Sequence, residues 1–166
     1  MIGRDNSLMN KKIKSNNFIK KYGRTALLVC WMAVIFMFSH APADDSTEVS
    51  HRAGRVIGSI TMKDFEDWST NKQELFIEQI DHAVRKSAHF TEYMILGILW
   101  VAVLGTHKKG KSWLLGTCYA VTDELHQYFI PGRSCQISDM MLDSAGVAAG
   151  VFVAAAAVVL FCRWKK

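Results

Sequence analysis

The sequence lacks the cysteine pattern of disulfide-linked secreted domains and the basic stripe that is typical of nucleic-acid-binding proteins. Its four cysteines do not form a disulfide framework pattern, because three of them fall in or at the ends of apolar segments. We interpret them as small apolar side chains. The net charge is +5, yet no basic stripe with interleaved aromatic residues is present, so nucleic-acid binding is disfavoured. No internal repeat or low-complexity tract is found.

Charge is also missing from long stretches. Residues 145–162 carry no charged side chain, although 21% of the whole sequence is charged. A membrane span needs roughly 17–25 mostly apolar residues. We therefore predict spans at about 22–41, 87–104, 112–130 and 137–162. The expected fold is an all-α integral membrane bundle of four transmembrane helices, with a basic N-terminal segment at 1–21 and the transmembrane domain at 22–166.

The longest segment between spans has the pattern of surface helices. Val49, Ala53, Val56, Ile57 and Ile60 recur at helical spacing, with polar residues between them, which predicts an amphipathic helix at the outer membrane surface. A second such helix is predicted at about 72–86, leading straight into the second span. Pro131-Gly132 predicts a tight turn between the third and fourth spans.

The basic residues are unevenly distributed along the chain. Thirteen of the twenty Lys and Arg residues lie before the first predicted span, between the second and third, or after the fourth. These three places share one side of a four-span protein, so both termini are predicted to be cytoplasmic in a multi-pass plasma-membrane protein. A competing interpretation makes the first span a signal peptide cleaved near Ala41-Pro42-Ala43. Cleavage would leave three spans and the same polar residues.

Ionisable side chains interrupt the second, third and fourth spans. Because each costs at least ~3 kcal/mol at the bilayer centre unless it is paired or hydrated, we expect them to share one polar pocket. Their 3-4 spacing places most of them on one face of each helix, with Lys86 and Tyr93 on a neighbouring stripe, Glu124 at the edge of its face and Arg133 in the connecting turn. These faces lie in the outer half of the membrane. The expected set is Arg85, Lys86, His89, Glu92, Tyr93, Asp123, Glu124, His126, Gln127, Arg133, Asp139 and Asp143.

Three functions fit such a pocket. It could be a purely structural ion-pair network. It could bind an anionic head group through Arg85, Lys86 and Arg133, with Tyr93 and Gln127 as further ligands and Asp139 and Asp143 orienting the cations. It could also be catalytic, with a reactive or proton-handling core of His89, Glu92, Asp123, Glu124 and His126.

A divalent metal is a further alternative for the same residues. His89 with Glu92, and Asp123 with His126, each place two ligand types three residues apart, as in helical-bundle metal sites. This spacing is common in helices, so no cofactor is assigned from it.

Several motifs together resemble the VanZ-like family. They are Phe38-Ser39 with Ser46 and Ser50, the run of residues 85–93, Leu96-Gly97, the run of residues 122–127, Pro131-Gly132-Arg133, and Asp139 with Gly146. The resemblance covers about residues 25–160. The family pattern often has Asn where this chain has Asp143.

The resemblance implies a small multi-span protein of Gram-positive-type envelopes, whose founding member is associated with low-level resistance to the glycopeptide teicoplanin. We therefore expect an outer-leaflet pocket that binds or modifies an anionic lipid or a lipid-linked cell-wall molecule. The rival expectation is a non-enzymatic accessory protein that alters drug access to the envelope. No protein partner is predicted.

Overall fold

The chain folds into five long helices in the computed structural model, which describes residues 2–165, with side chains from Lys21 onward except that of Asp45. No strand occurs in this described part, so the all-α prediction is confirmed. The long helices are α1 (Ile2–His40), α2 (Ala43–Thr61), α3 (Thr70–Leu104), α4 (Lys109–Gln127) and α5 (Ile137–Trp164). Two short 3₁₀ turns, η1 (Phe65–Asp67) and η2 (Thr106–Lys108), lie between them.

Three of the described helices are long and apolar enough to cross a membrane: α1 over Lys21–His40, α3 and α5. The predicted second surface helix and second span are one continuous helix, α3. The helix α4 does not qualify by composition, because its 19 residues include two lysines, Asp123 and Glu124. The four-span count therefore stays a prediction. So does the position of the basic segment, because the side chains of residues 1–20 lie outside the described part.

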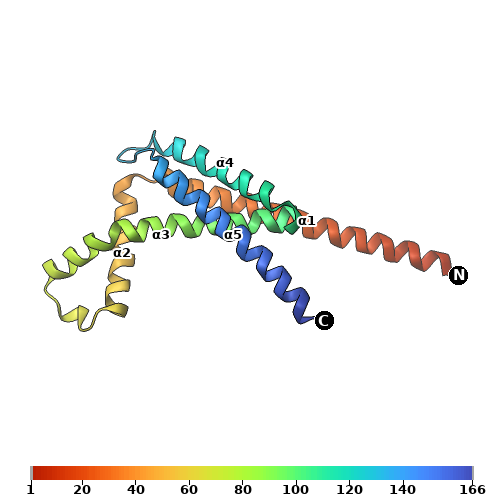
Figure 1. Ribbon diagram of the computed structural model, residues 1–166, viewed down its shortest axis with the longest axis horizontal. Coiled ribbons are helices and arrows are strands. Elements are labelled where there is room, and N and C mark those ends of the chain that lie inside the picture. The colour runs from red at the N-terminus through yellow and green to blue at the C-terminus, as the bar shows by residue number, and fades with distance from the viewer. Residues whose placement is uncertain (1, 166) are drawn as a thin grey trace.

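The central helix of the bundle is α3, which contacts the other four long helices. The helices α1 and α4 run against it and α5 runs with it, so the end of α1, the end of α4 and the start of α5 lie together (Figure 1). At the opposite end, Arg24 donates a hydrogen bond to the Ala102 carbonyl oxygen at 3.2 Å. The C-terminal half of α5 leaves the bundle (Figure 1).

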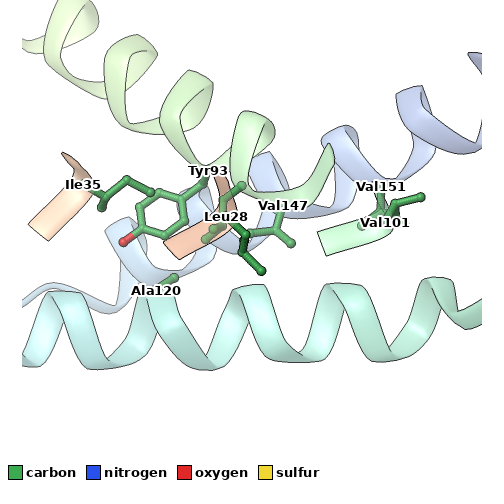
Figure 2. Close-up of a cluster of buried hydrophobic side chains, with 8 residues drawn as sticks. Leu28, Ile35, Tyr93, Val101, Ala120, Val147 and Val151 are labelled. Atoms are coloured by element: carbon green, nitrogen blue, oxygen red, sulfur yellow. The ribbon is translucent and has the colours of Figure 1, made fainter. Parts of the chain in front are cut away.

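The apolar core joins α1, α3, α4 and α5. Leu28, Tyr93, Leu96, Ala120 and Val147 are all buried in it (Figure 2). Burial of such side chains stabilises the packing of the helices. The core residues of α3 include Tyr93, which lies next to the polar end of the bundle.

Glycines set the distance between α3 and α5. A Cβ atom on Gly146 would lie 2.6 Å from the Phe90 carbonyl oxygen, and one on Gly150 would collide with the Met94 carbonyl. On the other helix, a Cβ on Gly97 would meet the Val147 carbonyl. The two backbones therefore touch, as small residues permit in membrane helices. This contact fixes where the polar start of α5 sits against α3.

The helix α2 packs on α3 and η1 through small residues and leaves its apolar stripe uncovered. Gly54 lies against Ile77 and Gly58 against Phe65, while the buried Ser50 hydroxyl donates to Asp81. Val49, Val56 and Ile60 remain exposed. The helix is thus amphipathic as predicted, but the face that packs on α3 is the small, polar one.

We predict that the α3–α5 contact reverses the usual effect of a helical Gly→Ala change, which stabilises by about 1 kcal/mol. Gly150→Ala should lower the thermal unfolding temperature of the purified protein in detergent, because its methyl group has no space. Gly23→Ala and Gly110→Ala are matched controls with no atom within 4 Å of the new Cβ, and neither should destabilise. Equal unfolding temperatures for Gly150→Ala and the controls would contradict the tight contact.

Candidate functional site

The buried carboxylate of Asp123 is hydrogen-bonded to three helices at the polar end of the bundle. Oδ2 of Asp123 accepts hydrogen bonds from the Ser39 hydroxyl at 2.7 Å, the Tyr93 hydroxyl at 2.8 Å and the Gln127 amide at 3.2 Å. These donors come from α1, α3 and α4. Asp123 is 3% exposed, so a diffusing substrate does not reach it without rearrangement of the helices. This part of the site is a structural network.

Arg133 closes the network from the loop between α4 and α5. Its guanidinium donates to the carbonyl oxygens of Phe38 at 3.0 Å and Ala41 at 2.9 Å, and so caps the end of α1. It also donates to Gln127 Oε1 at 3.1 Å and to the Ser46 hydroxyl at 2.5 Å. Four of its five N–H groups are thereby used within the protein.

The electrostatics of Arg133 agree with this buried position. Burial lowers the pKa of its guanidinium, while the nearby Asp123 and Glu124 carboxylates raise it. The ordinary pKa is far above neutral, so the side chain keeps its charge. Arg133 therefore neutralises the acidic end of the bundle, and it offers little to an external phosphate.

A small polar cavity lies on the other side of this network, between α3, α4 and α5. Its volume is about 30 Å³, enough for one or two water molecules. The residues that line it are Lys86, His89, Glu124, Gln127, Asp139, Leu142 and Asp143. Six of these seven were predicted site residues, and all three predicted helices contribute. The sequence pattern thus located a real convergence of polar side chains.

The cavity is acidic and incompletely bonded. Lys86 forms an ion pair with Asp139 at 3.0 Å, and Glu124 Oε1 accepts the Gln136 backbone N–H at 2.8 Å. Asp143 is 1% exposed, and neither of its carboxylate oxygens has a hydrogen-bond partner. Native proteins seldom leave such a group unsatisfied, because a buried lone charge is costly. Oδ1 of Asp123 is also unpartnered, but Asp143 is the carboxylate of the site with no hydrogen bond to either oxygen.

Arg85 lies outside the cavity and has a partner that the sequence analysis missed. Its guanidinium pairs at 2.5 Å with Asp81, one turn earlier on α3, and donates to Thr47 on α2 at 3.3 Å. We expected acids on the later spans to neutralise it. The i, i+4 spacing of Asp81 and Arg85 was readable in the sequence, but Asp81 lay outside the predicted span.

His126 also departs from the predicted face of α4. Its ring stacks on Phe36 with centroids 4.7 Å apart, and its Nε2 lies 3.3 Å from Nδ1 of His40. Residues 123 and 127 share a face four positions apart, whereas position 126 is turned toward α1. His126 is therefore separate from the cavity.

The structure does not bring the candidate metal ligands together. Within the part of the chain whose side chains are described, no group of three or more His, Cys, Asp and Glu residues is placed to hold a metal ion. The carboxylate of Glu92 makes no hydrogen bond or ion pair there, and its backbone oxygen accepts from Trp31 at 3.0 Å. The pairs His89–Glu92 and Asp123–His126 thus do not form one ligand set.

Three further polar residues join the site without having been candidates. Ser39 and Ser46 entered the sequence analysis only through the family resemblance, and they bond Asp123 and Arg133. Gln136 contributes a backbone N–H, which has no side-chain signature at all. Hydroxyl residues at the end of an apolar span were the one available signal.

Comparison with known proteins gives one match. The family model described as VanZ/LLP1 matches residues 25–161, which include every residue of the network and the cavity. Neither the curated proteins nor the solved structures contain a match to this chain.

We predict that Arg133 acts through the fork of its guanidinium and not through charge alone. Arg133→Lys keeps the charge but cannot reproduce four divergent hydrogen bonds, so it should cost about 1–3 kcal/mol of stability, close to the cost of Arg133→Gln. Thermal unfolding in detergent measures this. The control is Arg52→Lys, in an exposed pair with Glu48, which should change little. Wild-type stability in Arg133→Lys would refute the capping role.

Proposed function

Because the chain belongs to the VanZ/LLP1 family and has apolar helices around a polar cavity, we propose that it binds a lipid head group at the membrane surface. The ligand is an anionic, phosphate-bearing lipid or lipid-linked envelope molecule, and the cavity with its rim of cations is the binding site. The observation that carries the proposal is the position of Lys86. It lines the cavity, it is about one third exposed, and it is not part of the buried Arg133 network.

The proposal includes four spans, with the cavity at the outer leaflet. The helix α4 has 19 residues, about 28 Å at 1.5 Å per residue, which matches a hydrocarbon core of ~30 Å. It also packs against both α3 and α5. The basic residues lie mostly at the end of the bundle opposite the cavity, which supports cytoplasmic termini.

The helix α2 fits a position on the outer membrane surface. Its His51 and Arg55 line a second cavity together with Glu74 and Glu78, and so face the start of α3, away from the bundle. The uncovered stripe with Val49, Val56 and Ile60 lies on the other flank of α2. Its side chains are exposed, and in this placement lipid would cover them.

Binding is favoured over catalysis by the state of the candidate reactive groups. Asp123 is sequestered by three hydrogen bonds, and His126 faces α1. Ser39 is 1% exposed and donates to Asp123, so this hydroxyl is not open to a substrate. A phosphate at the rim could instead reach the exposed N–H groups of Lys86 and Arg85.

We predict that Lys86→Gln weakens phospholipid binding about tenfold, the loss expected for one charge-assisted hydrogen bond. Native mass spectrometry of the purified full chain with added phosphatidylglycerol measures bound lipid. Lys108→Gln is the matched control, because it removes the same charge at the opposite end of the bundle. Equal losses for the two variants would contradict a site at Lys86, and so would no loss for either.

We also predict that α2 inserts one flank into the membrane. In a chain whose native cysteines are replaced, a fluorescent label on Ile60→Cys should be quenched by brominated lipids in vesicles. A label on Arg52→Cys, on the charged flank, should be quenched far less. Equal quenching at the two positions would rule out this placement, while the head-group site would be unaffected.

A further inference from the structure

Asp143 lacks a hydrogen-bond donor. Its two buried oxygens have no partner, although the Lys86 ammonium and the His89 imidazole also line the cavity. Lys86 is paired with Asp139, and the Gln127 amide nitrogen donates to Ser39 and Asp123. The second oxygen of Glu124 accepts no hydrogen bond from the described residues. A group that brings its own N–H donors and a positive charge would satisfy both oxygens of Asp143.

The excess of negative charge in the cavity disfavours an anionic ligand group inside it. Three carboxylates, those of Glu124, Asp139 and Asp143, face one ammonium group, that of Lys86, and the imidazole of His89. A phosphate placed inside would add to this excess of negative charge. It fits only at the rim, beside Lys86.

The small volume of the cavity limits the size of the cation that it can hold. A cavity of about 30 Å³ holds a group of the size of one or two water molecules. A primary ammonium group meets this limit and presents three N–H donors. A trimethylammonium group has no N–H to offer Asp143, and it is several times larger.

We propose that this cavity is the subsite for a primary ammonium group of the lipid ligand, an inference that rests on the proposed head-group site. Asp143 binds the ammonium and Glu124 is the second acceptor, while the phosphate of the same head group lies at the rim near Lys86. The ligand class is thus a phospholipid or lipid-linked molecule that carries a free amine, such as an ethanolamine or aminoacyl head group.

The test is a methylation series of one head group. Binding of phosphatidylethanolamine, its N-methyl and N,N-dimethyl forms, and phosphatidylcholine to the purified full chain is measured by native mass spectrometry. Affinity should fall with each methyl group, by about tenfold or more across the series. Lysyl-phosphatidylglycerol against phosphatidylglycerol then distinguishes an aminoacyl source of the amine from an ethanolamine one.

The variant Asp143→Asn assigns the preference to the cavity. It should abolish the difference between phosphatidylethanolamine and phosphatidylcholine, and without lipid it should unfold at a higher temperature than the wild type, because it removes an unpaired buried carboxylate. Glu78→Gln on the exposed part of α3 is the control and should keep the difference. If Asp143→Asn does not fold, the methylation series on the wild type decides alone.

Three outcomes overturn the inference. Equal affinity across the methylation series would exclude an ammonium subsite, even with lipid bound. A preference that survives in Asp143→Asn would place the amine elsewhere. Stabilisation of the wild type by sodium or potassium ions that competes with phosphatidylethanolamine would make the cavity an ion site. Failure of every phospholipid to bind would instead refute the proposed function itself.

Discussion

The buried carboxylate of Asp123 is the constraint around which the polar end of the protein is organised. A carboxylate in an apolar bundle is tolerated only with close donors, and here these come from Ser39, Tyr93 and Gln127. Each donor sits on a defined turn of α1, α3 or α4. The axial register of the three helices is therefore tied to one oxygen atom, and Arg133 supplies the compensating charge through Gln127.

The polar residues divide into two parts with different states of bonding. Toward α1, hydroxyl, amide and guanidinium groups bond Oδ2 of Asp123 and the residues around Arg133, while Oδ1 of Asp123 lacks a partner in the described part of the chain. Toward α5, Asp143 is left without a partner beside Glu124 and the Lys86–Asp139 pair. A structural network and the proposed binding site are thus compatible in this protein. The first ties three helices together beside the cavity in which Asp143 is unpartnered.

Much of this arrangement could be predicted from the sequence, because apolar length and helical spacing are local properties. The uncharged run at 145–162 located α5, and the spacing of Lys86, His89, Asp139 and Asp143 brought them to one cavity. Partner choice could not be predicted. Arg85 pairs within its own helix, and His126 turns to α1, because a rotation of one residue decides which neighbour a side chain meets.

The helix α2 shows a second limit of pattern reasoning. Its periodic apolar residues marked it correctly as amphipathic, yet it packs on α3 through Ser50 and Gly54 and on η1 through Gly58. Small residues give the closest approach of two backbones, and a hydrophobicity pattern does not register them. The apolar stripe is then left for a different environment.

The position of Arg133 bears on what a proteolytic nick at the end of the first helix would do. On one side of Ala41-Pro42-Ala43 the guanidinium binds the carbonyl oxygens of Phe38 and Ala41, and on the other it binds the Ser46 hydroxyl. A signal-peptidase cut at this point would break the covalent chain between two segments that are both hydrogen-bonded to the Arg133 side chain. The severed leader would stay in place as a non-covalent subunit, so processing and loss of the first helix are separable events.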